Sequence, residues 1–269
     1  SYLSNSIKLL IKLFSNNNEK SLKITELAHN KLTENGFVYK DSNYDLAIAI
    51  GGDGSFIRMV NSNHFSSDTL YVGVNAGTLG FAQEVAIEEL DDFILELKNK
   101  TYKVDNIGIQ ETSIYTKDGK YDYNSLNEVV IRQENLNTLL LKVYIEDSML
   151  EEFSGDGLLI STSFGSTAYN LSLGGSIVYN TFHTLQITPI APISNKSYRN
   201  LNRSVILPDN MKVTLEPSRS KDLLVIVDGE IKKYSDVDKI ETTVKDKRIR
   251  CIRRKDYNFA KKINEKFLK

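Results

Sequence analysis

The first hundred residues alternate short apolar runs with segments in which apolar residues recur every three or four positions. The apolar runs predict strands over residues 7–14, 45–50 and 70–74. The last two are almost wholly apolar, as expected for strands buried on both faces of a parallel sheet. Helical spacing of apolar residues predicts three helices, over 24–32, 56–63 and 87–97. This alternation predicts an α/β N-terminal domain, doubly wound around a mostly parallel sheet, over residues 1–103.

Beyond residue 102 the pattern changes to short strands separated by turn signals. The predicted strands are 107–115, 126–132, 139–146, 157–161, 205–207, 212–216, 223–227 and 239–244. They indicate a β-rich C-terminal domain over residues 104–254. Phe259, Ile263 and Phe267 then recur at helical spacing. We expect a helix within 255–269 that packs back on the first domain.

Composition narrows the class of protein. The chain has 269 residues and a net charge of −1, which disfavours a general nucleic-acid binder. One cysteine excludes an internal disulfide, and three scattered histidines disfavour a histidine-rich metal site. No apolar run approaches the ~18–20 residues of a membrane span. We read the start as a strand rather than a signal peptide, and expect a cytoplasmic protein without nucleic-acid or membrane partners.

A basic stretch lies near the end of the chain. Arg248, Arg250, Arg253 and Arg254 crowd together, but Ile249 and Cys251 alternate with the charges at strand spacing. We interpret the stretch as a solvated strand face rather than a nucleic-acid patch.

The first candidate site is the turn Gly51-Gly52-Asp53-Gly54, which follows a buried strand and opens a helix. Glycines let backbone N–H groups approach a phosphate, and a helix N-terminus favours its negative charge. Asp53 could hold magnesium or accept a proton from an attacking hydroxyl. The alternative is a tight turn whose aspartate caps the helix. Neither the Walker sequence nor Gly-x-Gly-x-x-Gly occurs in the chain.

Two further segments carry groups suited to a nucleotide. Residues 156–175 follow an apolar strand and are crowded with Ser, Thr and Gly around Tyr169, which offers hydroxyls and a ring for stacking. Asn127 and Glu128 interrupt an apolar strand. Asn donates and accepts, whereas ionised Glu only accepts, so the pair suits adenine edges or ribose hydroxyls. Alone, Asn127-Glu128 is also typical of a strand edge.

In this order and spacing, the three segments resemble the NAD kinase family. The resemblance also covers Val72-Gly73-Val74-Asn75, Gly77-x-Leu79-Gly80-Phe81, Gly174-Gly175 and 188–192, and so spans essentially the whole chain. The Ser-Thr-Gly-Ser-Thr-Ala-Tyr type of run is the part of the resemblance that is specific to this family. Gly-Gly-Asp-Gly is shared with diacylglycerol and sphingosine kinases.

The resemblance implies an activity and a role for each matching residue. The activity is transfer of the γ-phosphate of ATP to the adenosine ribose 2′-hydroxyl of NAD, with Asp53 as general base. Magnesium would accompany ATP, and no metal would be fixed by the protein alone. Asn127 and Glu128 would hold the adenosine portion, and Asp156 the nicotinamide side. The implied binding residues are Gly51, Gly52, Gly54, Phe81, Asn127, Glu128, Asp156, Phe164, Ser166, Thr167, Ala168, Tyr169, Asn170, Ser172 and Ala191.

The chain departs from the family pattern at a few positions. Ser55 stands where Thr is usual and keeps the hydroxyl. Ser163-Phe164 replaces Pro-Thr, and we expect the Phe164 ring to support the dinucleotide. Ser154 stands two residues before Asp156, near a position where many members carry Arg.

Two other functions remain as alternatives: a diacylglycerol-type lipid kinase and a non-catalytic dinucleotide sensor. The hydroxyl-rich run suits a sugar nucleotide better than acyl chains, and the intact Asp53 argues against a sensor. The resemblance also implies a homodimer or homotetramer. The sequence leaves open polyphosphate as donor, NADH as acceptor, and the effect of the departures on affinity.

Overall fold

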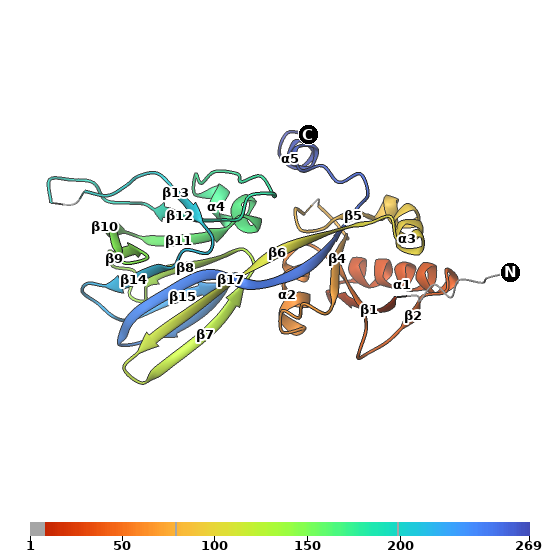
Figure 1. Ribbon diagram of the computed structural model, residues 1–269, viewed down its shortest axis with the longest axis horizontal. Helices are drawn as coiled ribbons and strands as arrows, with labels where there is room; N and C mark the ends of the chain where they lie inside the picture. Colours follow the sequence, from red (N-terminus) through yellow and green to blue (C-terminus); the bar gives the residue numbers. More distant parts are fainter. Residues whose placement is uncertain (1–8, 79, 198) are drawn as a thin grey trace. The chain divides into compact units, whose positions relative to one another are not determined.

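The computed structural model describes residues 9–78, 80–197 and 199–269 (Figure 1). The chain divides into two compact units. Unit 1 is Ser1–Ile107 with Arg248–Lys269, and unit 2 is Gly108–Lys247. The sequence predicted that the second domain covers residues 104–254. In the structure, residues 248–254 belong instead to unit 1. Two long strands, β6 (Lys103–Thr116) and β17 (Val237–Arg253), each begin in one unit and end in the other.

Unit 1 is an α/β unit built on a parallel sheet. Its elements are β1 (Leu10–Ser15), α1 (Glu19–Glu34), β2 (Val38–Tyr39), β3 (Leu46–Gly51), α2 (Asp53–Ser62), β4 (Leu70–Asn75), β5 (Val85–Ala86), the 3-10 helix η1 (Ile87–Glu89), α3 (Leu90–Asn99) and α5 (Phe259–Phe267). The sheet has the order β2–β1–β3–β4, and β5 and the end of β17 also pair with β4. Of the predicted strand 7–14, residues 7 and 8 lie outside the described residues, as does Leu79.

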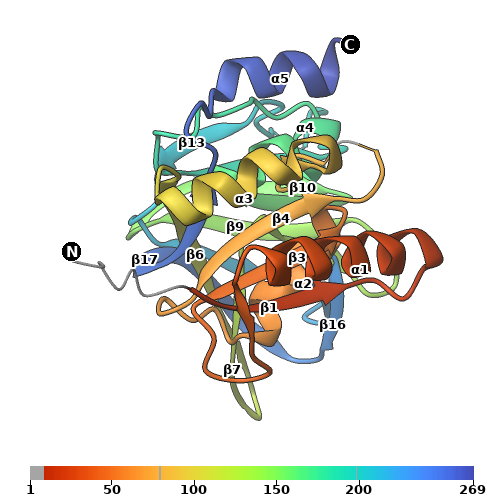
Figure 2. The ribbon, with the colours of Figure 1, turned by 90° about the vertical axis from the view of Figure 1, so that its right-hand side faces the viewer.

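Burial explains why these segments form a doubly wound layer. Every residue of β3 and β4 is buried, because helices cover both faces of the sheet. Figure 2 shows α1 and α3 on one face and α2 on the other. Leu32 of α1 and Phe93 of α3 pack in one core with the strand residue Ile48. Asn18 begins α1 by accepting a hydrogen bond from the Ser21 N–H at 2.8 Å, a role that asparagine commonly fills at a helix N-terminus.

Unit 2 is β-rich. Its elements, besides parts of β6 and β17, are β7 (Gly119–Ser125), β8 (Glu128–Gln133), β9 (Leu139–Ile145), β10 (Ser148–Gly155), β11 (Gly157–Thr162), the 3-10 helix η2 (Phe164–Thr167), α4 (Tyr169–Ser172), β12 (Thr184–Ile190), β13 (Val205–Pro208), β14 (Val213–Pro217), β15 (Leu223–Val227) and β16 (Glu230–Tyr234). One antiparallel sheet has the order β13–β12–β11–β8–β15–β16. A second set contains β10–β9–β14–β17 and the β6–β7 hairpin.

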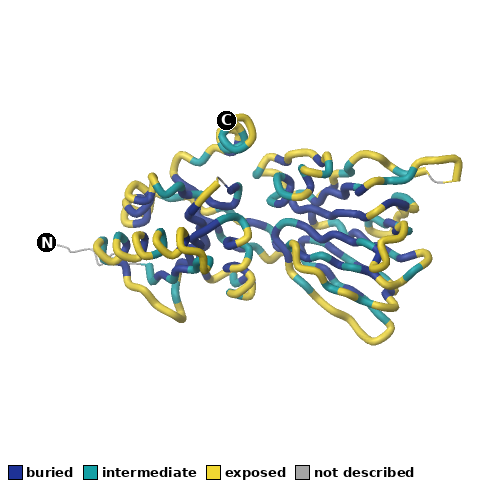
Figure 3. Tube along the Cα trace, turned by 180° about the vertical axis from the view of Figure 1, so that it is seen from behind, coloured by how far each residue is buried: buried dark blue, intermediate teal, exposed yellow. Residues whose placement is uncertain are grey.

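Inward-facing side chains of both sheets form the core of unit 2. Leu158 and Ile160 of β11 pack with Leu141 of β9 and Leu215 of β14. The buried stretches along these strands are visible in Figure 3. The predicted fold class, an α/β N-terminal domain with a β-rich C-terminal domain, is therefore confirmed.

Among the described residues, no helix is long and apolar enough to span a membrane. The predicted C-terminal helix is α5, which begins with the Asn258 side chain accepting from the Lys261 N–H at 2.9 Å. Its Phe259 ring lies edge-on to the Phe81 ring, with centroids 5.5 Å apart. The helix thus packs within unit 1.

Candidate active site

The turn after β3 places Asp53 at the start of α2. Gly52 is the N-cap, and Asp53 is the first residue of the helix. The Asp53 carboxylate does not cap α2. Its Oδ2 accepts the Phe81 N–H at 2.9 Å, and its Oδ1 accepts the Ala82 N–H at 2.8 Å. The capping alternative therefore fails, and the carboxylate is held by a segment about thirty residues further along the chain.

Gly51 is the glycine of the turn that close packing requires. Gly51 has φ +150°, and a Cβ there would lie 2.3 Å from Ser55 Oγ. The carbonyls of Gly51 and Gly52 both accept hydrogen bonds from Gln83 Nε2, at 2.8 and 2.9 Å. Gly54 is exposed. The hydroxyl of Ser55, which replaces the usual Thr, donates a hydrogen bond to Asn16 Oδ1 at 2.8 Å.

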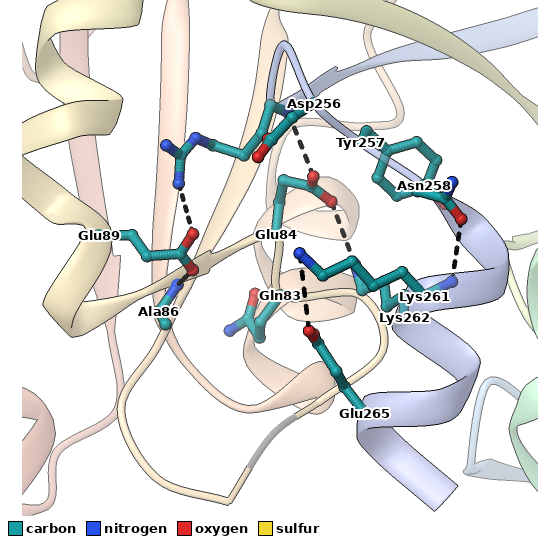
Figure 4. Close-up of a pocket in the computed structure, with 11 residues that line it drawn as sticks. Gln83, Glu84, Ala86, Glu89, Asp256, Tyr257, Asn258, Lys261, Lys262 and Glu265 are labelled. Atoms are coloured by element: carbon teal, nitrogen blue, oxygen red, sulfur yellow. Dashed lines mark hydrogen bonds and ion pairs between the residues drawn. The ribbon is translucent and has the colours of Figure 1, made fainter.

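A cavity of about 220 Å³ lies in unit 1 between α5 and the segment that follows Phe81 (Figure 4). Its wall carries paired charges: Lys262 Nζ lies 3.1 Å from Glu84 Oε2. The same Glu84 oxygen lies 3.1 Å from Nη1 of Arg253, which does not line the cavity. Arg254 pairs with Glu96 at 2.8 Å. Burial lowers the pKa of Lys262, and the Glu84 charge opposes that shift.

The interpretation of the basic stretch as a solvated strand face is wrong at its end. Arg253 and Arg254 are only 6% and 8% exposed, because each guanidinium enters this ion-pair cluster. Arg250 donates to the carbonyls of Ser67 and Asp68, both at 2.8 Å. Sequence spacing predicted the strand, but it did not predict carboxylates from other elements that neutralise these arginines.

In unit 2, Asp228 holds the backbone of the Asn127-Glu128 pair. Its carboxylate accepts N–H groups from Leu126 at 2.7 Å, Asn127 at 2.8 Å and Glu128 at 3.3 Å. Asp228 itself has φ +47°, in the left-handed region, which aspartate tolerates better than most residues. Asn127 precedes β8 and does not lie within it. The pair therefore sits at a strand end, fixed by a residue a hundred positions away.

The sequence predicted Glu128 to be an ionised side chain that only accepts hydrogen bonds, and the structure differs from this expectation. Burial, and then the neighbouring Asp228 carboxylate, raise the pKa of Glu128 to about 8, although a hydrogen bond from the Tyr169 backbone opposes the shift. Burial raises the pKa of Asp228 as well, against the effect of its backbone donors. Near neutral pH the Glu128 carboxyl is mostly protonated and can donate a hydrogen bond as well as accept one.

The hydroxyl-rich loop packs directly on Asn127. Thr162 Oγ1 donates to the Leu126 carbonyl and accepts the Gly165 N–H at 3.0 Å. A Cβ on Gly165 would lie 2.1 Å from the Asn127 carbonyl oxygen, so only glycine fits there. The structure thus brings together the second and third candidate segments.

Side chains of the loop differ in what they present. Ser166 and Asn170 are fully buried: Ser166 Oγ accepts the Val178 N–H, and Asn170 bonds the Ser166 carbonyl and the Thr188 hydroxyl. Tyr169 is 39% exposed, and its hydroxyl accepts from Arg132 Nη2 at 3.1 Å. Phe164, Thr167 and Ala168 are half-buried, and Ser172 is exposed.

Asp156 and Ala191 lie next to each other, both exposed. The Asp156 N–H donates to the Ile190 carbonyl at 3.0 Å, and Ala191 has φ +45°. Ser154, where the family pattern places Arg nearby, is buried, and its hydroxyl accepts from Asn200 Nδ2 at 2.7 Å.

The structure adds four residues that sequence patterns missed: Gln83, Arg132, Asp228 and Lys266. Lys266 Nζ lies 3.9 Å from Asp53 Oδ2. Asp228 lies in the turn between β15 and β16, and only its contacts show a further role. In the described part of the chain, no group of three or more His, Cys, Asp or Glu side chains could hold a metal ion.

Comparison with known proteins identifies a matching family, and relatives that match along almost the whole chain. The ATP-NAD kinase C-terminal domain family matches residues 126–253. An NAD kinase of Finegoldia magna is 38% identical, over 98% of this chain and 100% of the relative. An NAD kinase 1 of Oceanobacillus iheyensis is 30% identical, over 96% and 97%.

Two solved structures share the fold. Yeast NADH kinase complexed with NADH has a TM-score of 0.81 at 20% identity, over 97% of this chain and 88% of that one. An NAD kinase from Archaeoglobus fulgidus in complex with ATP has a TM-score of 0.74 at 17% identity, over 95% and 99%. Because relatives that are NAD kinases match this chain along almost their full length at 30% identity or more, the chain belongs to the NAD kinase family.

Proposed function

We propose that this enzyme transfers the γ-phosphoryl group of ATP to the 2′-hydroxyl of the adenosine ribose of NAD, with Asp53 as the general base. The geometry of the Asp53 carboxylate is the observation that supports this role. Two backbone N–H groups fix its orientation at the end of a parallel strand, where ligands bind in open α/β sheets. Each carboxylate oxygen keeps a lone pair for a hydroxyl proton.

The step balances without any further reactant. The ribose hydroxyl oxygen forms a bond to the γ-phosphorus, and the bond from that phosphorus to the β-phosphate oxygen breaks. The hydroxyl proton passes to Asp53, and ADP leaves. Phosphoryl transfer depends mainly on positioning and on stabilising charge, so the base contributes about 10²–10⁴-fold.

The glycine turn suits the phosphates of ATP. Gly51, Gly52 and Gly54 offer backbone without side chains at the N-terminus of α2, a helix of ten residues. Magnesium fits this arrangement as a partner of the triphosphate. It prefers oxygen ligands, keeps several waters and needs only one or two carboxylates, and Asp53 is the carboxylate at the turn. When bound, it would neutralise charge on the phosphates.

The dinucleotide would bind to unit 2. Protonated Glu128 and the Asn127 amide can donate to and accept from ribose hydroxyls or adenine edges. The exposed ring of Tyr169 offers a stacking surface, with Thr167, Ala168, Ser172, Phe164, Asp156 and Ala191 as further contacts. Ser166 and Asn170 act through the shape of the loop, because their side chains are bonded inside it.

The assay of purified protein with ATP, magnesium and NAD should give NADP. Asp53→Asn should lower kcat by at least about 10²-fold while calorimetry shows NAD binding preserved. Asp68→Asn, an exposed aspartate on a surface loop of unit 1, is the matched control and should keep full activity. Near-normal turnover of Asp53→Asn would contradict the base assignment. Phosphorylation of diacylglycerol would favour the lipid-kinase alternative, and NAD binding without turnover the sensor.

We also propose a cytoplasmic homodimer or homotetramer, on the family resemblance alone. Size-exclusion chromatography with light scattering measures the molar mass of the protein in solution and therefore its oligomeric state. The same assay with polyphosphate for ATP, or with NADH for NAD, measures the donor and acceptor range.

A further inference from the structure

The five residues 80–84, which we call the clamp segment, fix the catalytic turn from one side. The N–H groups of Phe81 and Ala82 bind the Asp53 carboxylate, and Gln83 bonds two carbonyls of the turn. Gly80 allows this approach, because a Cβ there would lie 2.4 Å from Asp53 Oδ1. The position of Asp53 therefore depends on the position of the clamp segment.

Helix α5 is anchored to the same segment. The Phe81 ring contacts the Phe259 ring edge-on at 5.5 Å and stacks with the Phe267 ring at 6.4 Å. Lys262 Nζ lies 3.1 Å from Glu84 Oε2 (Figure 4). It also lies 5.3 Å from the centre of the Phe81 ring. Contacts of α5 with the clamp segment thus occur at both ends of the helix and in its middle.

This anchoring places a positive charge beside Asp53. Lys266 lies one helical turn after Lys262, so both side chains leave the same face of α5. Its Nζ is 3.9 Å from Asp53 Oδ2, beyond hydrogen-bond distance, and its side chain is only 23% exposed. A lysine that formed only a surface ion pair with Asp53 would add little to the stability of the fold, and its side chain would be mostly exposed to solvent.

We propose that Lys266 is a further residue of the phosphoryl-transfer centre, whose ammonium group binds the terminal phosphates of the nucleoside triphosphate beside Asp53. This inference rests on the proposed function. The ammonium group carries three donors and a full charge, and lysine is a common phosphate ligand. Negative charge is spread over the transferring group's oxygens in the transition state, where a preorganised cation is most effective.

The kinetic test compares Lys266→Met, which keeps length and apolar contact, with Lys266→Arg, which restores the charge. Lys266→Met should lower kcat by about 10-fold or more, since losing one preorganised donor costs about 10²–10³-fold in a well-studied enzyme. It should also raise the KM for ATP and leave the KM for NAD unchanged. Lys266→Arg should recover most of the loss. Lys261→Met is the matched control, because the Lys261 side chain is 69% exposed on the same helix and pairs with Glu265.

Binding of a non-hydrolysable ATP analogue, followed by calorimetry, tests the contact without turnover. Weaker analogue binding to Lys266→Met but not to Lys261→Met supports the proposal. Wild-type kinetics of Lys266→Met would overturn it, as would equal losses in the Met and Arg variants with a lowered melting temperature, which indicate a packing role. A failure of Asp53→Asn to lose activity would refute the general base instead, and the analogue titration would still decide on Lys266.

Discussion

The carboxyl group of Glu128 links local burial to the proposed binding of NAD. Its pKa of about 8 arises from desolvation and from the Asp228 charge, so the neutral, donating form prevails below that pH. We expect the affinity for NAD to fall as the pH rises from about 7 to about 9, because ionised Glu128 no longer donates. Glu128→Gln stays neutral and should bind NAD with little pH dependence, as measured by calorimetry. A parallel decline in both proteins would assign the pH effect to another group.

The same residue predicts how stability depends on pH. The pKa of Glu128 is raised in the folded chain above its ordinary value of 4.5. Above about pH 4.5 the unfolded chain releases this proton while the folded chain keeps it, so stability falls from there to about pH 8 and then levels off. Glu128→Gln removes this loss. Its melting temperature should exceed that of the wild type more at pH 8 than at pH 5, whereas an unchanged difference would contradict the buried neutral carboxyl.

At residue scale, the sequence could predict the groups that motifs carry and could not predict their supports. Asp53 and Asn127 follow from local patterns, because glycines and polar interruptions are visible along the chain. Asp228 and Gln83 do not, since their contacts join positions separated by about 100 and about 30 residues. The burial of Arg253 was mispredicted for the same reason: its partner Glu84 comes from a distant element.

At the scale of elements, hydrophobic patterning predicted the buried strands and missed the polar ones. β3 and β11 are almost continuously apolar and buried. β7 and β16 are largely polar and exposed along most of their length, so they lack the signal that burial leaves in a sequence. β12 also passed unnoticed, although most of it is buried.

The link between the clamp segment and the turn gives a prediction for Gln83, which is 1% exposed. Gln83→Ala leaves two carbonyls of the turn without their donor. We expect a loss of about 1–3 kcal/mol in the free energy of unfolding, and a fall in kcat because the turn that carries Asp53 is no longer fixed. Urea denaturation and steady-state kinetics measure the two effects.

Gln133→Ala is the control for Gln83→Ala. Gln133 is also buried, at 3% exposed, but bonds a single carbonyl, that of Ser220 in unit 2. It should lose stability with kcat preserved. Equal effects of both variants on kcat would mean that general destabilisation, and not the turn, governs turnover.

At the scale of the whole molecule, two units have separate cores, and we propose that ATP binds to unit 1 and NAD to unit 2. The core of unit 1 surrounds the parallel sheet, and the core of unit 2 lies among its antiparallel strands. A ligand that binds a folded unit suppresses the local opening of the elements it contacts. Each nucleotide should therefore protect a different set of backbone amides, which makes the assignment of ligands to units measurable.

Hydrogen exchange followed by mass spectrometry tests that assignment on the Asp53→Asn variant, whose kcat we expect to be lower by at least about 10²-fold. A non-hydrolysable ATP analogue should slow exchange in the catalytic turn, the clamp segment and α5. NAD should slow exchange at residues 126–128 and in the loop 162–172, because the loop packs on Asn127 and the Asp228 carboxylate holds that backbone. Protection by NAD confined to unit 1 would contradict dinucleotide binding by unit 2. Protection of α5 by NAD and not by the ATP analogue would place Lys266 at the acceptor and not at the donor phosphates.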